Sequence, residues 1–273
     1  MVDDVPVLGA ALTLDMLARH RDWVLAAQRD VELQSFASPH ALAGDMGGLI
    51  ARARGLLDGH EGRLGLHGPF LGFQIDAPDP GVAEVARARM LACLDACEAL
   101  GADQMVIHSP VSTWDHFNHQ SEPAQALIQI ERVRWLMAPV IARAEAIGVV
   151  LVIENVEDVD AAARCRLADA LASPVVAVSL DTGHAQYARN LAGGPPVDVC
   201  VEVAGKRLQH VHLQDTDGFA DRHWHPGEGA LLWRKIFAAL GRLTQMPRLI
   251  LEVNDSRAIQ TGAVHLAALG LAR

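Results

Sequence analysis

The sequence predicts an α/β protein, a single-domain (β/α)8 barrel that spans residues 1–273. The length matches the usual size of one such barrel, and 51% hydrophobic residues are enough to bury a large core. Eight short apolar runs, rich in β-branched residues, alternate with longer segments of helical periodicity. A strand followed by a helix, repeated eight times, implies parallel strands that close into a barrel.

Segments 82–100 and 124–147 have apolar residues at every third or fourth position, which is typical of helices packed on a sheet. Gly101 and Gly148 each follow such a segment and precede a strand, as a glycine that ends a helix does. The Gly-Gly-Pro-Pro stretch at 193–196 is predicted to be a loop between the sixth strand and its helix. The eight strands are predicted near residues 5–12, 31–36, 63–67, 103–108, 149–153, 175–180, 208–213 and 248–253.

The composition favours a cytoplasmic protein. The first residues, MVDDVPVLGAALTLD, are acidic and lack the basic segment of a secretory signal. No apolar run reaches the ~18 residues that span a bilayer, so we expect no membrane segment. The cysteines show no metal-finger spacing, and we expect them to be reduced packing residues. They are Cys93, Cys97, Cys165 and Cys200.

Charge also narrows the function. A formal net charge of −10 disfavours a polyanionic partner. The only two lysines, Lys206 and Lys235, fall in predicted helices away from strand ends. Schiff-base and pyridoxal-phosphate chemistry therefore have no evident lysine.

Nine residues able to bind a divalent cation stand just after, or at the ends of, the apolar runs. A parallel barrel gathers the C-terminal ends of its strands in one mouth, so residues far apart in sequence can meet there. One ligand type at the end of each of six successive strands favours a metal site over unrelated structural hydrogen bonds. Strands three to eight end with His67, His108, Glu154, Asp181, His212 and Glu252, and His184, Asp221 and His223 complete the set.

Glu154 and Glu252 each follow an aliphatic run. Burying a carboxylate costs several kcal/mol unless it is paired or bound to a metal. A salt bridge inside the barrel is the alternative, but few strand residues are basic. A cation shared with Asp181 and His212 would have mainly oxygen ligands, which suit Mn, Mg or Co and also accept Zn.

The motifs in which these residues stand resemble those of the xylose-isomerase-like TIM barrel superfamily, over essentially the whole chain. This superfamily contains sugar and sugar-phosphate isomerases and epimerases, and also the endonuclease IV group of abasic-site endonucleases. The motifs are HGPF (67–70), IENV (153–156), DTGHA (181–185), HLQD (212–215), DRHWHPGEG (221–229) and LEV (251–253).

The resemblance implies two alternatives. In the sugar epimerases, the residues matching Glu154, Asp181, His212 and Glu252 hold one divalent metal, and the two glutamates face opposite sides of the substrate as proton donor and acceptor. In the endonucleases, residues matching all nine hold three zinc ions. The ligand inventory alone does not choose between them.

The predicted mouth loops favour a small neutral substrate over nucleic acid. Segments 67–80 and 108–123 contain no Lys or Arg but several acidic residues. The basic residues predicted near the mouth are Arg189, Arg222 and Arg257. DNA binding needs several cationic contacts to phosphates, and a phosphorylated sugar is disfavoured by the same deficit.

Five aromatic residues fall in these loops, where rings can stack on a sugar or cap the barrel core. Trp114 is the strongest candidate for a substrate contact together with Trp224. The others are Phe70, Phe73 and Phe117.

These observations predict a metal-dependent isomerase or epimerase of an unphosphorylated sugar or keto-sugar. Glu154 and Glu252 would move a proton through an enediolate. The other residues are expected to bind the substrate or further metal: His67, His108, Trp114, His184, Asp221, Arg222 and His223. A keto-sugar lyase using the same enediolate, a multinuclear zinc phosphodiesterase, and a barrel that only binds sugar or metal stay open. Apolar mouth loops are compatible with a homo-oligomer.

Overall fold

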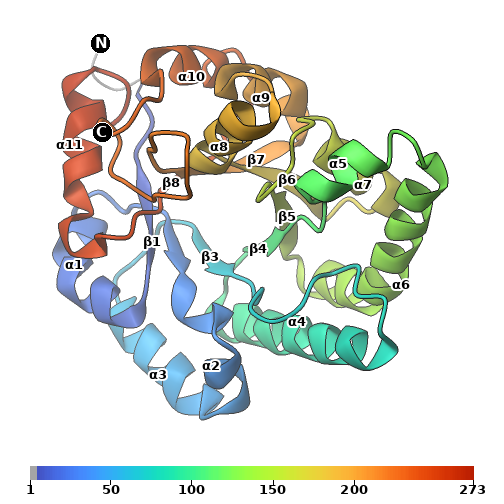
Figure 1. Cartoon of the computed structure of the whole chain (residues 1–273). Helices are drawn as coiled ribbons and strands as arrows, with labels where there is room; N and C mark the ends of the chain where they lie inside the picture. Colours follow the sequence, from blue (N-terminus) through green and yellow to red (C-terminus); the bar gives the residue numbers. More distant parts are fainter. Residues whose placement is uncertain (1–4) are drawn as a thin grey trace.

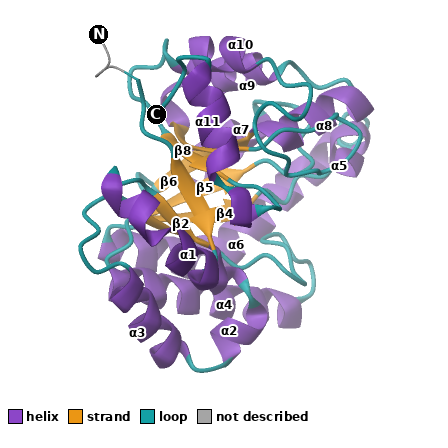
Figure 2. Cartoon of the chain, turned by 90° about the vertical axis from the view of Figure 1, so that its left-hand side faces the viewer, coloured by secondary structure: helices purple, strands orange, loops and turns teal. Residues whose placement is uncertain are grey.

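The computed structural model describes residues 5–273 and shows a closed barrel of eight parallel strands in the order β1 to β8. Helices surround the ring of strands on all sides (Figure 1), and the strands lie in the middle of the side view (Figure 2). The predicted (β/α)8 barrel is confirmed. The strands are β1 (Gly9–Leu12), β2 (Val31–Leu33), β3 (Leu64–His67), β4 (Gln104–His108), β5 (Val150–Glu154), β6 (Val176–Asp181), β7 (Leu208–Leu213) and β8 (Arg248–Leu251).

The helices follow the predicted alternation. Gly101 and Gly148 have φ of 71° and end α4 and α6, as predicted. The α-helices are α1 (Leu14–Ala26), α2 (Pro39–Ala43), α3 (Met46–Leu56), α4 (Pro80–Leu100), α5 (Thr113–Asn118), α6 (Pro123–Ile147), α7 (Ala163–Leu171), α8 (Thr182–Ala192), α9 (Val197–Ala204), α10 (Trp233–Leu240) and α11 (Gln260–Ala268). Short 3-10 helices are η1 (Gln34–Ala37), η2 (Gly205–Arg207) and η3 (Ser256–Ala258).

Three details differ from the prediction. The second strand, predicted near 31–36, ends at Leu33, and Gln34–Ala37 form η1. The first strand begins at Gly9 rather than near residue 5, and residues 1–4 of the acidic start lie outside the described part. The 193–196 loop joins α8 to α9 instead of joining the sixth strand to its helix. The reason is that Asp181, the last residue of β6, accepts a hydrogen bond from the backbone N–H of His184 and so starts α8 at once.

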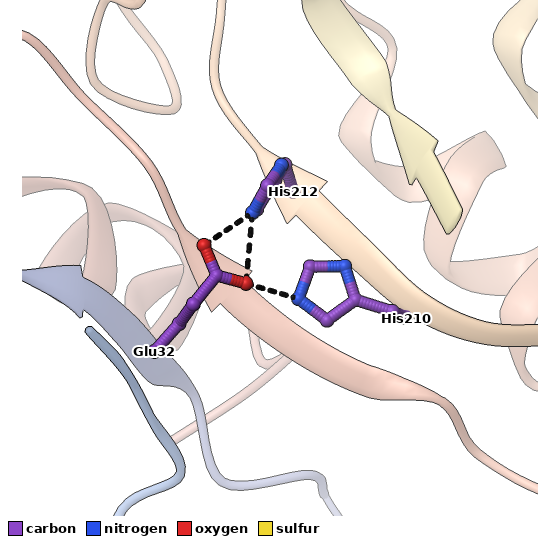
Figure 3. Close-up of side chains that lie close together, drawn as sticks. All are labelled: Glu32, His210 and His212. Carbon is purple, nitrogen blue, oxygen red and sulfur yellow. Dashed lines mark hydrogen bonds and ion pairs between the residues drawn. The ribbon is translucent and has the colours of Figure 1, made fainter. Parts of the chain in front are cut away.

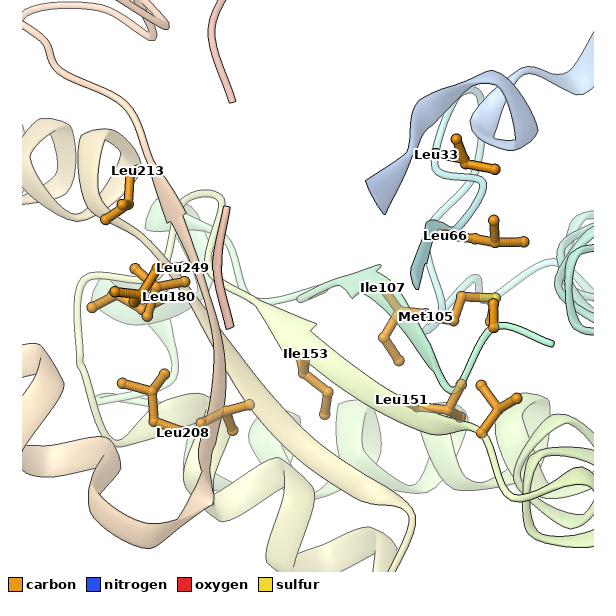
Figure 4. Packing of buried hydrophobic residues seen from close by; sticks show 14 of the residues in the cluster. Leu33, Leu66, Met105, Ile107, Leu151, Ile153, Leu180, Leu208, Leu213 and Leu249 are labelled. Carbon is orange, nitrogen blue, oxygen red and sulfur yellow. The ribbon is translucent and has the colours of Figure 1, made fainter. Parts of the chain in front are cut away.

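Side chains on successive strand residues point alternately out of the barrel and into it. Met105, Ile107 and Leu151 belong to the large apolar core between the strands and helices, some of whose side chains appear in Figure 4. Val106 and Val152, at the intervening positions, belong to a separate small cluster with Ala177. Because side chains two residues apart face the same side, the last side chain of several strands points into the barrel mouth.

None of the described helices has both the length and the apolar composition needed to cross a membrane. All four cysteines are buried and unpaired. Their burial agrees with the predicted packing role.

Candidate metal centre

Four of the predicted ligands meet at the C-terminal end of the barrel. Glu154, Asp181, His212 and Glu252 each offer a ligand atom, and these atoms lie within 4.8 Å of one another. The register explains the meeting, because Asp181 lies beside His212 on the paired strands β6 and β7. All four side chains are buried, so the group is a compact cluster of three carboxylates and one imidazole below the protein surface.

His212 lies at the centre of this group. Its Nδ1 is 2.9 Å from Glu154 Oε1 and 3.2 Å from Glu252 Oε2. Glu252 is fixed from its other oxygen, Oε1, which accepts a hydrogen bond of 2.7 Å from Gln34 Nε2. The imidazole therefore faces two carboxylates through one nitrogen.

Two carboxylate oxygens of the group fit a cation because hydrogen bonds do not satisfy them. Glu154 Oε2 and Asp181 Oδ2 are buried and have no hydrogen-bond partner among the described residues. The other oxygen of Asp181 accepts hydrogen bonds from His184 N–H at 2.7 Å and from Gln214 Nε2 at 3.1 Å. Unpartnered buried carboxylate oxygens are costly, and a divalent cation held by these residues would offset that cost.

A second group adjoins the first through Glu154. His67 Nε2 and His108 Nε2 lie 3.7 and 3.6 Å from Glu154 Oε2. Phe70 stacks on His108, with ring centroids 4.2 Å apart. His67 donates from Nδ1 to the carbonyl of Gly68 at 2.9 Å, which leaves Nε2 directed at the carboxylate.

A third group comprises His184, Asp221 and His223. Both imidazoles approach Asp221 Oδ1 through Nε2, at 3.3 Å from His184 and 3.0 Å from His223. Their Nδ1 atoms donate to the carbonyls of Asn155 and Glu252, at 2.8 and 3.2 Å. His67, His184 and His223 thus share one arrangement, in which a backbone carbonyl fixes Nδ1 and Nε2 is left for a ligand role.

In the metal-free protein, protons on side chains of these groups balance part of the negative charge that a bound cation would balance. Although burial opposes it, the carboxylates around His212, Glu252 first, raise its pKa well above the ordinary value. Burial also lowers the pKa of His67 and of His223, but the carboxylates beside them have the larger effect. Glu154 beside His67 and Asp221 beside His223 raise both pKa values to about 9. Burial raises the pKa of Asp181 to about 6. A bound metal would displace these protons from the histidines.

The remaining predicted site residues lie further out. Arg222 is paired with Asp217 at 2.9 Å and lies over the Trp224 ring, at 5.5 Å from its centroid. Trp114 is on α5 with 74% of its surface exposed. A cavity of about 170 Å³ lies beside His108 and is lined partly by Phe70 and Phe73, whereas Trp114 is not among its lining residues.

Sequence reasoning missed three buried residues beneath the first group. Glu32 on β2 and His210 on β7 lie next to His212, and Ser179 on β6 contacts His210. The sequence did contain a signal for them. Glu32 is a charged residue within an apolar strand, and His210 is two residues before His212, so both histidines face the same side of β7. Only strand ends were considered as ligand positions, and these three lie deeper in the barrel.

The closed parallel barrel, with His, Asp and Glu side chains clustered at its C-terminal mouth, is a (β/α)8 barrel with candidate metal ligands where such barrels carry their active sites. Residues 29–269 match the family model described as "Xylose isomerase-like TIM barrel", and the chain belongs to this family. The resemblance predicted from the motifs is thereby confirmed. No curated protein matches the sequence significantly.

Solved structures agree over nearly the whole chain. A Thermus thermophilus protein soaked with ZnCl2 is 26% identical, with a TM-score of 0.75 and coverage of 97% of this chain and 99% of that one. A "Putative Xylose isomerase" from Rhodospirillum rubrum is 18% identical, with a TM-score of 0.77 and coverage of 98% and 99%. A D-tagatose 3-epimerase-like protein is 16% identical, with a TM-score of 0.71 and coverage of 96% and 98%. At such identities the last two show the shared fold.

Proposed function

We propose that the protein is a divalent-metal-dependent isomerase or epimerase of a small unphosphorylated sugar or keto-sugar. The observation that supports this most is the buried group of Glu154, Asp181, His212 and Glu252, with two carboxylate oxygens that lack hydrogen-bond partners. These four residues would hold the cation, which is Mn, Mg, Co or Zn by the chemistry of its ligands. When bound, such a cation supplies positive charge that polarises a carbonyl and stabilises an enediolate.

The two glutamates would move the proton. Glu252 is the more accessible of the two, and its Oε1 is held by Gln34, so its position toward the mouth is fixed. Glu154 is fully surrounded, and its Oε2 faces His67 and His108. Against the effect of burial, His212 and its neighbours hold the pKa of Glu154 well below the ordinary value, so it is an ionised base at neutral pH.

The surroundings of the site support a neutral substrate. The cavity beside His108 is lined by apolar rings and by polar groups such as Ser109, Ser112 and Glu157, with no Lys or Arg among its lining residues. Arg222 is already paired with Asp217. Hydroxyl groups of a sugar match these walls better than a phosphate does.

Proton transfer is testable directly. The metal-loaded protein is incubated in deuterium oxide with a panel of ketoses, and NMR is used to detect deuterium beside the carbonyl. Glu252→Gln should lower the exchange rate by about 10²–10⁴-fold, because a general acid/base contributes that much. Asp255→Asn, an exposed change in the same loop, is the matched control. Exchange at the wild-type rate in Glu252→Gln would reject the proposed role.

A second candidate is a multinuclear zinc phosphodiesterase of the abasic-site endonuclease type. The specific observation in its favour is that three potential ligand groups adjoin one another and that two of them share Glu154. Metal analysis of the purified protein separates the two candidates. Three zinc ions per chain, nicking of abasic DNA and no exchange with any sugar would replace the isomerase proposal.

A keto-sugar lyase would share the enediolate chemistry. Its product distinguishes it, since elimination yields an unsaturated or dicarbonyl compound whereas isomerisation keeps the composition of the sugar. The cytoplasmic location and the homo-oligomeric state stay predictions, and size-exclusion chromatography with light scattering tests the second.

A further inference from the structure

Glu32 joins two histidines below the candidate metal centre. Its carboxylate lies between His210 and His212, which come from the same strand (Figure 3). The Nε2 atom of His212 is 3.0 Å from Glu32 Oε1 and 3.2 Å from Oε2, and His210 Nε2 is 2.9 Å from Oε2. All three side chains are buried, so water does not compete for these contacts.

The proton positions follow from donor and acceptor accounting. Ser179 Oγ is 2.8 Å from His210 Nδ1, and its hydroxyl can donate there. His210 then carries its proton on Nε2, which points at Glu32. An ionised carboxylate only accepts hydrogen bonds, so His212 must also present a proton from Nε2 to Glu32.

The consequence for His212 concerns its other nitrogen. Metal binding requires the neutral imidazole, which has one N–H, so once a cation displaces the Nδ1 proton, the proton kept on Nε2 leaves the lone pair on Nδ1. Nδ1 is the atom that faces Glu154 and Glu252, at 2.9 and 3.2 Å. The lone pair is therefore directed into the group that would hold the cation.

We propose that Glu32 is a positioning residue that keeps His212 in the tautomer able to bind a divalent cation through Nδ1. Ser179 and His210 would fix Glu32 in turn, which makes a buried chain of four side chains from β6 and β7 to β2. This role rests on the metal site of the proposed function but not on the reaction catalysed there. A carboxylate behind a metal-bound histidine orients the ring and raises its basicity.

The same three residues could instead hold a separate cation. Two features favour hydrogen bonds. His212 Nε2 is within hydrogen-bond distance of both Glu32 oxygens, at 3.0 and 3.2 Å, and His210 Nε2 lies at ion-pair distance, 2.9 Å from Oε2. A cation there would also require His212 to bind metal through both ring nitrogens.

The test is the zinc affinity of Glu32→Gln, measured by competition with a chromophoric chelator. A glutamine amide keeps the shape but offers an N–H group to one of the two histidines. His212 can answer by moving its proton to Nδ1, which removes the lone pair from the metal group. We expect the affinity to fall by about 10–100-fold.

Two further variants separate this role from general damage to the fold. Asp158→Asn changes another buried carboxylate, whose contacts are Ser109, Val156 and Arg164, and should keep the wild-type affinity. Glu32→Asp retains the charge on a shorter side chain and should restore part of the lost affinity. Equal zinc affinity in Glu32→Gln and the wild type would overturn the proposal.

A measurement on the wild type decides the case even if the Glu32 variants do not fold. Long-range ¹H–¹⁵N NMR of the zinc-loaded protein should show His212 protonated at Nε2 and coordinated at Nδ1, and the reverse assignment would overturn the proposal. Loss of one whole zinc equivalent in Glu32→Gln, with the remaining zinc bound as in the wild type, would identify a separate cation site instead. Absence of zinc binding by the wild type would remove the proposed function itself.

Discussion

The floor and the rim of the barrel mouth hold their polar side chains in different ways. We define the floor as seven buried side chains on or next to strands: Glu32, Ser179, His210 and the four proposed metal ligands Glu154, Asp181, His212 and Glu252. We define the rim as Trp114, Arg222 and Asp221, which are more exposed and lie on α5 or on the loop after β7. The comparison suggests that binding of a cation depends on the floor, whereas the rim affects the substrate that would bind above the floor.

The largest expected effect is at Asp181, which has two separable roles. Its Oδ1 starts α8, and its Oδ2 has no hydrogen-bond partner among the described residues. Asp181→Asn keeps an oxygen for the helix start but removes the charge. Metal affinity should therefore fall by at least about 10²-fold, which is more than the loss expected when a residue that only supports a metal ligand is changed. Asp181→Ala should lose a similar affinity and also about 1 kcal/mol of stability from the missing helix cap.

Chelator competition measures the affinity, and chemical unfolding of the metal-free variants measures the stability. The two variants control for each other, because both lose the charge and only Asp181→Asn keeps an oxygen for the hydrogen bonds from His184 N–H and Gln214 Nε2. Metal affinity within about threefold of the wild type in Asp181→Asn would contradict the assignment of the floor as the metal site.

The second prediction concerns pH and uses the protons held by the floor and its neighbours. The pKa of His67 and of His223 is raised from 6.5 to about 9 in the folded metal-free protein. A raised histidine pKa contributes stability that is fully present below about 6.5 and is lost as the pH rises through about 9. Asp181, whose pKa is raised from 3.8 to about 6, contributes stability below about 3.8 that is lost as the pH rises through 6.

The metal-free protein should therefore lose thermal stability between pH 6.5 and 9, by roughly 2–4 °C for each kcal/mol lost. Because a cation held by the neighbouring four residues would disfavour the positive charge of His67 and His223, its apparent affinity should rise over the same interval, with release of protons on binding. Calorimetry in the presence of a chelator, and titrations in buffers of different ionisation enthalpy, measure both effects. A flat stability profile from pH 6.5 to 9 would contradict the protonated histidines.

Four of the seven floor residues were predictable from sequence because strand order and a period of two determine where they lie. Glu154, Asp181 and His212 are strand residues at or near the C-terminal ends of β5, β6 and β7, and Glu252 follows β8 directly. Glu32 was missed because it lies in the middle of β2 and not at a strand end, and its contact with His212 depends on barrel closure, which brings β2 across from β7.

The rim was less predictable because loop conformation is set by contacts that periodicity does not encode. Arg222 illustrates this, since its pairing with Asp217 depends on a turn within the loop after β7. Trp114 is a second case, because the start of α5 is fixed by the Ser112 capping box and not by any feature of the tryptophan.

The third prediction is a small effect at Arg222. The Arg222 and Asp217 side chains are 39% and 34% exposed, and exposed ion pairs contribute little to stability because solvent screens them. Arg222→Ala should therefore leave metal affinity unchanged and change the free energy of unfolding only slightly. A rise in KM with unchanged kcat would support its predicted contact with the far end of the substrate.

The smallest effect is expected at Trp114. Its side chain is 74% exposed, so Trp114→Ala should change the free energy of unfolding by no more than about 0.5 kcal/mol. Metal affinity should be unchanged because the residue lies on α5, outside the buried groups. Phe70→Ala is the informative partner, since Phe70 stacks on His108 and lines the adjacent cavity. If KM rises in Phe70→Ala but not in Trp114→Ala, substrate binds against the wall next to the floor; the opposite result would restore the predicted substrate contact at the rim.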